Sequence, residues 1–215
     1  MAFDFGFDFR ATAGFVTDPN FCAPELGELY PHTYTNALGT SITAGAIDPS
    51  AVQNTRDRNA SNDPRLAGQD GNNGNTFTPS FFQFKVALPF SGQWSVVLAS
   101  GDQAFASSEY ISILDNTTVI ASYSAVSVAT NNYMDASGNV WPQASFFASQ
   151  VPIVYTFASS ILIVQVGPSS PTGSSGSNLA HLRITSGQAT DESGGAPSLQ
   201  LVYNLWPRST VQIFS

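Results

Sequence analysis

Alternating aromatic residues open this chain. Phe3, Phe5, Phe7 and Phe9 are separated from one another by single residues of other kinds. A period of two places all four rings on one side of an extended backbone. The segment is therefore predicted to be a β-strand with one buried face.

Similar short segments follow along the chain. Residues 82–88 carry apolar side chains at every second position, and a turn at 89–92 leads into 93–100, which predicts a β-hairpin. A second hairpin is predicted from 110–114 and 118–123, because Asp115-Asn116-Thr117 forms a short turn between them. Residues 14–50 are predicted to be mostly ordered loop. Further strands are predicted at 41–47, 145–147, 153–157, 161–166, 179–185, 199–205 and 211–214.

The composition agrees with a chain built from strands. Only 10% of the residues are charged, and Ser, Thr, Asn, Gln, Gly and Pro dominate the polar remainder, unlike the Glu-, Lys- and Leu-rich composition of helical proteins. Short strands at this spacing are typical of a sandwich or a barrel. At 215 residues the chain is long enough for one sizeable core, so we expect one main domain.

The charge balance excludes some partners. A net charge of -8 with Lys85 as the single lysine argues against binding to nucleic acid and to anionic membranes. Met1 leads directly into Ala-Phe-Asp-Phe, and no apolar run reaches membrane-spanning length, so we expect a soluble protein without a secretion signal. A secreted module trimmed to its mature boundary would look the same.

Few residues suggest catalysis. His32 and His181 are the two histidines, and no Ser lies in a Gly-x-Ser-x-Gly elbow, so we expect no enzyme activity. The strand histidine, His181, is interpreted as a hydrogen-bonded structural residue. Cys22 is the only cysteine and is expected to be a half-buried thiol. No cofactor motif is present. Loop carboxylates and carbonyls leave a structural calcium ion open, although no Asp-x-Asp-x-Asp-Gly array occurs.

The preferred ligand site is a loop tip flanked by aromatic residues. Tyr133 and Trp141 enclose Met134-Asp135-Ala136-Ser137-Gly138-Asn139. Aromatic rings can stack on the apolar faces of sugars, and loops carry binding residues more often than strands do. We therefore predict ligand binding by Tyr133, Trp141, Asp135 and Asn139. The alternative is that a sandwich core uses these rings for packing.

Charged residues are concentrated in one short segment of a chain that has few of them. Arg56, Asp57, Arg58, Asp63 and Arg65 lie within ten positions. Guanidinium groups can tie a long loop to carbonyls and carboxylates, or they can contact a ligand directly. The first interpretation is favoured, so the five residues are predicted to form a structural network.

Several short motifs resemble a known family. They are Phe3-Asp4-Phe5-Gly6, Arg56-Asp57-Arg58, Val86-Ala87-Leu88-Pro89, Gly92-Gln93-Trp94-Ser95-Val96 and Gly101-Asp102. Their order and spacing over about residues 1–186 resemble the galactose-binding-like jelly-roll modules attached to rhamnogalacturonan acetylesterases. Gln93-Trp94 stands where those modules usually have a Tyr after the Gly. The resemblance implies an all-β, antiparallel sandwich of jelly-roll type without a catalytic centre.

A second resemblance points to viruses. Gly14-Phe15-Val16-Thr17-Asp18, Arg65-Leu66-Ala67-Gly68 and Ala180-His181-Leu182-Arg183-Ile184-Thr185 look like stand-alone proteins of tailed bacteriophages. The resemblance implies a structural protein on the virion surface, such as a head decoration or fibre-associated subunit, with other virion proteins or itself as partner and with glycan binding open. The alternative is a carbohydrate-binding module of a secreted polysaccharide-degrading system.

The domain prediction combines the first resemblance with the pattern of the tail. Residues 1–186, which that resemblance covers, are predicted to form the jelly roll. Residues 187–215 have no recognised counterpart in those modules, and apolar residues alternate again after a loop-like stretch. They are therefore predicted to be a C-terminal extension that can add a strand to this sheet or to a neighbour's.

Overall fold

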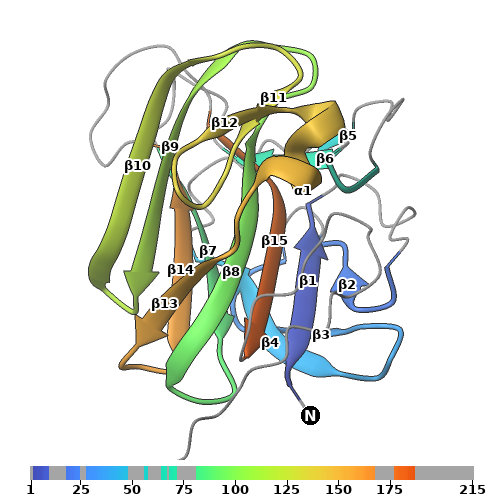
Figure 1. Ribbon diagram of the computed structural model, residues 1–215. Helices are drawn as coiled ribbons and strands as arrows, with labels where there is room; N and C mark the ends of the chain where they lie inside the picture. Colours follow the sequence, from blue (N-terminus) through green and yellow to red (C-terminus); the bar gives the residue numbers. More distant parts are fainter. Residues whose placement is uncertain are drawn as a thin grey trace, which may run out of the picture.

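Two facing β-sheets form the protein in a computed structural model (Figure 1). The structure describes residues 2–9, 18–24, 28–47, 56–57, 64–66, 68–71, 81–167 and 177–186. The predicted strands at 199–205 and 211–214, and the extension at 187–215 as a whole, lie outside these residues.

The larger sheet has nine strands among the described residues. Its main order is β12 (Val140–Pro142), β11 (Asn132–Met134), β8 (Gly92–Gly101), β15 (Asn178–Ser186), β1 (Asp4–Asp8) and β2 (Phe21–Cys22). Strand β13 (Ile153–Phe157) pairs with β8, β6 (Gly68–Gly71) pairs with β15, and β5 (Arg56–Asp57) pairs with β6. These pairs are antiparallel except β1 with β2.

The smaller sheet is antiparallel throughout. Its order is β10 (Thr118–Val128), β9 (Ser107–Asp115), β14 (Ile161–Val166), β7 (Phe82–Ala87), β4 (Ser41–Ala46) and β3 (His32–Thr35). Consecutive strands repeatedly change sheet, since β7, β9 and β14 belong to this one while β8, β13 and β15 belong to the other. The fold is therefore the predicted antiparallel β-sandwich of jelly-roll type.

This exchange of strands corrects one prediction. Strands β7 and β8 do not form a hairpin, because β7 pairs with β4 and β14, and β8 pairs with β15, β13 and β11. The turn after Leu88 carries the chain across the core instead. Both strands still place large apolar side chains in the same interior, and alternation alone cannot distinguish an arch from a hairpin.

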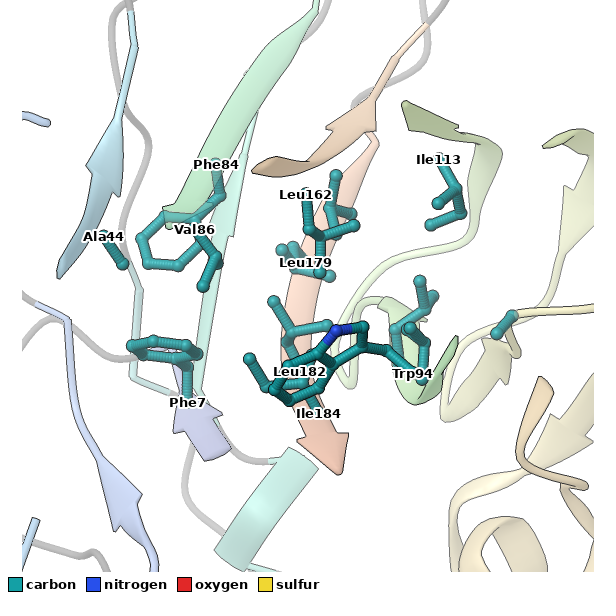
Figure 2. Close-up of a cluster of buried hydrophobic side chains, with 14 of the residues drawn as sticks. Phe7, Ala44, Phe84, Val86, Trp94, Ile113, Leu162, Leu179, Leu182 and Ile184 are labelled. Carbon is teal, nitrogen blue, oxygen red and sulfur yellow. The ribbon is translucent and has the colours of Figure 1, made fainter. Parts of the chain in front are cut away.

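The core lies between the two sheets (Figure 2). Phe5, Phe7 and Phe9 have no exposed surface, as the opening alternation predicts. The rings of Phe7 and Phe84, from opposite sheets, meet edge to face with centroids 5.0 Å apart, and Trp94 is fully buried.

The other face of β1 is covered as well. A Cβ on Gly6 would come within 2.1 Å of Cε1 of Phe21, so only glycine leaves room for that ring. The sequence predicted one buried face for this strand, and the structure buries both.

Most other strand predictions are confirmed, including the hairpin formed by β9 and β10. The strand predicted at 145–147 is wrong. Residues Gln143–Ser145 form a 3-10 turn, η2, and Phe146–Ser149 form a short helix, α1. Phe146 and Phe147 are both buried, which a helical turn permits and alternation along a strand does not. The predicted loop at 14–50 also contains β2 and β3. Within the described residues, no helix is both long and apolar enough to cross a membrane.

Candidate functional site

The loop between β11 and β12 is built around one carboxylate. Oδ1 of Asp135 accepts hydrogen bonds from the backbone N–H of Ser137 (2.8 Å), the Ser137 hydroxyl (2.7 Å) and the N–H of Asn139 (3.0 Å). Asp side chains that bond to the following backbone in this way fix tight turns. Gly138, at φ 84°, completes the turn in a conformation that favours glycine.

The second oxygen of this carboxylate holds the tryptophan. Oδ2 of Asp135 accepts a hydrogen bond of 2.7 Å from Nε1 of Trp141. The Trp141 side chain is partly buried against a second apolar cluster on the outer side of the larger sheet. Asn139 is exposed, and its Nδ2 donates to the hydroxyl of Ser137 at 2.9 Å. The loop therefore presents an oriented indole ring beside an amide.

Tyr133 lies inside the fold. Only 1% of its surface is exposed, and its hydroxyl donates a hydrogen bond of 2.7 Å to the backbone carbonyl of Leu66. The residue is the cross-strand neighbour of Trp141, so the structure does bring the two predicted rings together. The face of the Tyr133 ring is not open to a ligand, and stacking at this loop would depend on Trp141.

The structure describes part of the predicted arginine network. Arg56 and Asp57 form β5; their side chains, and the whole of Arg58 and Asp63, lie outside the described residues. Arg65 belongs to the short turn η1 (Pro64–Leu66), and its guanidinium carbon lies 3.5 Å from the centroid of the Phe147 ring. Arg65 thus contacts a protein ring, and the structural role of the other four residues stays a prediction.

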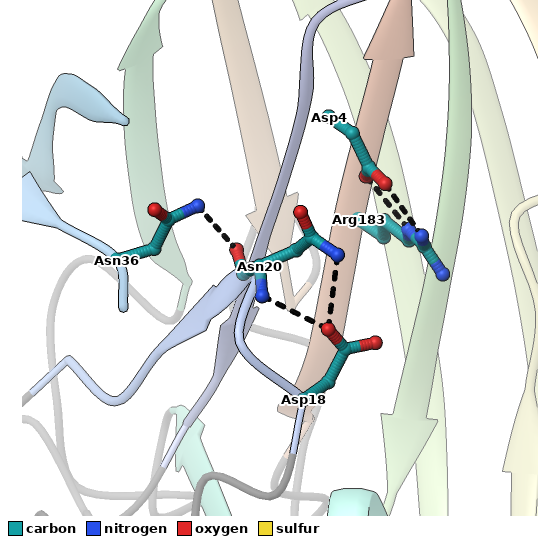
Figure 3. A network of polar contacts seen from close by, with 5 residues as sticks. All are labelled: Asp4, Asp18, Asn20, Asn36 and Arg183. Atoms are coloured by element: carbon teal, nitrogen blue, oxygen red, sulfur yellow. Dashed lines mark hydrogen bonds and ion pairs between the residues drawn. The ribbon is translucent and has the colours of Figure 1, made fainter. Parts of the chain in front are cut away.

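Two side-chain pairs on the outer side of the larger sheet, Arg183 with Asp4 and His181 with Asp8, join β1 to β15. Arg183 donates two hydrogen bonds to Asp4, from Nε at 2.8 Å and from Nη2 at 2.6 Å (Figure 3). Nδ1 of His181 lies 2.8 Å from Oδ1 of Asp8, and Phe21 and Phe147 pack on the imidazole. The predicted structural role of His181 is confirmed.

Polar loop contacts lie beside these pairs. Oδ1 of Asp18 accepts hydrogen bonds from the backbone N–H and from Nδ2 of Asn20, at 2.9 and 3.0 Å. Nδ2 of Asn36 donates to the carbonyl of Asn20 at 3.2 Å (Figure 3). These polar groups hydrogen-bond to one another, and the bond to Asn36 connects the loop before β2 to the rest of the sandwich.

A polar row crosses the outer face of the smaller sheet. Ser122, Ser112, Gln165 and Gln83 are successive cross-strand neighbours on β10, β9, β14 and β7. Nε2 of Gln83 donates to Oε1 of Gln165 at 2.7 Å, and the two serine hydroxyls are 3.1 Å apart. Sequence reasoning missed this row, although polar residues at the outward positions of four strands were a visible signal.

The described residues hold no group of three or more His, Cys, Asp or Glu side chains arranged to bind a metal ion. The calcium alternative stays an expectation from the sequence.

Comparison with known proteins gives low structural overlap. No protein-family model matches the chain, and no curated protein matches its sequence. A family 35 carbohydrate binding module from Clostridium thermocellum is 14% identical, with a TM-score of 0.37 over 65% of this chain and 90% of that one. The CBM36-1 domain of a multidomain xylanase from the hindgut metagenome of Trinervitermes trinervoides is 7% identical, with a TM-score of 0.33 over 69% of this chain and 99% of that one.

A larger enzyme also overlaps in part. The isomalto-dextranase of Arthrobacter globiformis T6, complexed with panose, is 12% identical with a TM-score of 0.37 over 66% of this chain, but the match spans only 23% of the enzyme. At this level of overlap, the function of this chain has to come from its own residues. These comparisons do not test the virion interpretation, which stays a prediction.

Proposed function

We propose that this chain is a non-catalytic carbohydrate-binding module and that the loop of Asp135 is its sugar site. The observation that carries this proposal is the hydrogen bond from Trp141 Nε1 to Asp135 Oδ2. It fixes a partly exposed indole ring in one orientation before any ligand arrives. A side chain that is already ordered loses less conformational entropy on binding.

The chemistry of the loop fits a sugar. The C–H groups on one face of a pyranose ring pack on an aromatic ring, while its hydroxyls need donors and acceptors. Asn139 is exposed beside the indole and supplies both kinds of group. Asp135 is 1% exposed and acts through the positions of Trp141, Ser137 and Asn139.

The alternative of a virion surface protein receives no comparable support from the described residues. The predicted homo-oligomer and the assembly role of 187–215 depend on a segment outside them. We therefore adopt the module interpretation that the sequence left as its alternative.

A panel of soluble plant, bacterial and fungal polysaccharides tests the proposal by affinity electrophoresis, followed by titration calorimetry with the best ligand. We expect Trp141→Ala to weaken binding at least tenfold, which is about 1.4 kcal/mol. Phe90→Ala is the matched control, because Phe90 is 48% exposed and lies in the turn between β7 and β8. Binding that is equal in Trp141→Ala and wild type would place the site elsewhere, with the polar row as the next candidate.

A further inference from the structure

A buried acidic cluster closes one end of the sandwich, where β8 ends and β9 and β15 begin. Glu109 on β9 has no exposed surface. Ser100 and Asp102, from the end of β8, are 0% and 4% exposed, and Ser177 and Asn178, at the start of β15, are 0% and 5% exposed. Burial at this level removes the water that would otherwise solvate a carboxylate.

The two oxygens of Glu109 have different surroundings. Oε2 accepts hydrogen bonds from the Ser100 hydroxyl at 2.5 Å and from the backbone N–H of Asn178 at 3.0 Å. Oε1 is buried and has no hydrogen-bond partner. The buried hydroxyl of Ser107, two residues earlier on the same face of β9, also makes no hydrogen bond of normal geometry, but it lies close enough to influence the carboxyl group of Glu109.

The charges around Glu109 favour its neutral form. Asp102, the residue after β8, adds a negative charge that acts on Glu109. Ser177 and Asn178, at the start of β15, are neutral. Strand β14 contains no titratable residue, and β10 contains only Tyr123, whose hydroxyl interacts with Tyr155. Among the described Lys and Arg side chains, Arg65 lies over the ring of Phe147, Lys85 lies over the ring of Tyr30, and Arg183 pairs with Asp4.

We propose that Glu109 is a proton-operated latch: a neutral carboxylic acid that joins β8, β9 and β15 in mildly acidic solution and loosens this end of the sandwich when it ionises. The proton lies on Oε1, the oxygen without a donor, and the Ser107 hydroxyl can accept it. Oε2 keeps its bonds to Ser100 and Asn178 in either state. Ionisation adds a negative charge at a fully buried position close to Asp102.

The direction of the pH effect follows from the two states. Burial, with a smaller contribution from the Asp102 charge, raises the pKa of Glu109 from 4.5 to about 7, although the hydroxyls of Ser100 and Ser107 and the backbone N–H of Asn178 act in the opposite direction. An acid with a raised pKa in the folded state contributes its full stability below its unfolded pKa. That contribution is lost as the pH rises from about 4.5 to about 7 and stays lost above it.

Chemical unfolding of the full chain between pH 4.5 and 8.5 tests the latch, together with the infrared carbonyl band of a neutral carboxyl group. We expect the unfolding equilibrium constant of the wild type to rise over this range, on the order of a hundredfold. Glu109→Gln should remove this rise and the infrared band, since the amide carbonyl can accept the bonds that Oε2 accepts and the amide NH2 replaces the protonated Oε1 without ionising. Asp115→Asn, at the other end of β9, is the control. It should leave the pH-dependent rise of the unfolding constant and the infrared band unchanged.

Two further experiments test the latch if Glu109→Gln fails to fold. Asp102→Asn should shift the pH dependence to lower pH, because it removes the neighbouring negative charge and keeps the acceptor for the Ala104 N–H. An unchanged profile in Asp102→Asn would overturn the proposal. Stabilisation of the wild type by added Ca²⁺ at pH 8 would overturn it too, since a cation would then neutralise the cluster in place of the proton.

Discussion

Strand β9 carries two carboxylates with opposite behaviour, one near each end. Glu109 is fully buried, and burial raises its pKa to about 7. Asp115 lies in the turn to β10, where the hydroxyl of Ser159 and the N–H groups of Ala158 and Ser159 donate to it and hold its pKa below the usual 3.8. Both carboxyl groups accept hydrogen bonds, so hydrogen bonding alone does not decide whether a pKa rises or falls. Access to water decides the direction of the pKa shift, because a carboxylate in contact with water keeps part of its solvation while it gains hydrogen-bond donors.

The largest effect is expected at the buried end. Ser100→Ala removes the 2.5 Å hydrogen bond to Glu109. At pH 8, where Glu109 is charged, the free energy of unfolding should fall by about 2–3 kcal/mol, and at pH 5, where it is neutral, by about 1 kcal/mol. Urea unfolding at both pH values measures the difference.

Ser112→Ala is the control for this change. Ser112 lies on the same strand with a hydroxyl bond on the outer face of the sheet, so its loss should stay within about 0.5 kcal/mol. Equal losses at pH 5 and pH 8 in Ser100→Ala would mean that Glu109 does not change its charge between them.

A smaller loss of stability, with the opposite pH dependence, is expected at the Asp115 end of β9. Asp115→Asn replaces the carboxylate that joins the β9–β10 turn to the β13–β14 turn, and the free energy of unfolding at pH 7 should fall by about 1 kcal/mol. A lowered folded pKa means that wild-type stability is present above the unfolded pKa, near 3.8, and is lost as the pH falls through the folded value. Wild type and variant should therefore converge in acid.

Unfolding followed from pH 7 to pH 3 shows this convergence. Ser159→Ala keeps the carboxylate and removes its main donor, so it should reproduce part of the loss. A gap between wild type and Asp115→Asn that persists at pH 3 would show that the turn depends on the shape of the residue and not on its charge.

The two ends of β9 also show what the sequence could predict. The turn Asp115-Asn116-Thr117 is local, so the hairpin of β9 and β10 followed from turn chemistry. The burial of Glu109 is not local, because besides the end of β8, nine residues earlier at Ser100, it needs the start of β15, 69 residues later at Asn178. The same reason explains the missed arch between β7 and β8, which depends on which sheet each strand joins.

The candidate site divides in the same way. Asp135, Trp141 and Asn139 belong to one short loop, and sequence reasoning selected them together. The burial of Tyr133 could not be predicted from that loop, because its cover comes from Leu66 and Phe146. Alternation along a strand shows which side chains share a face of the sheet. It does not show whether the outer face is covered by other elements.

Cys22 offers a kinetic test of partial burial. The sequence predicted a half-buried thiol, and the structure confirms it. Partial burial, with a smaller contribution from the charge of Glu28, raises the pKa of this thiol from 9.0 to about 11. Because the thiolate is the reactive form, alkylation by iodoacetamide at pH 8 should be about a hundredfold slower in the folded protein than in urea. Glu28→Gln should speed alkylation of the folded protein modestly and leave the rate in urea unchanged. Equal alkylation rates in the folded protein and in urea would show that partial burial at β2 does not shield the thiol from water, so that it would resemble the carboxylate of Asp115 more than that of Glu109.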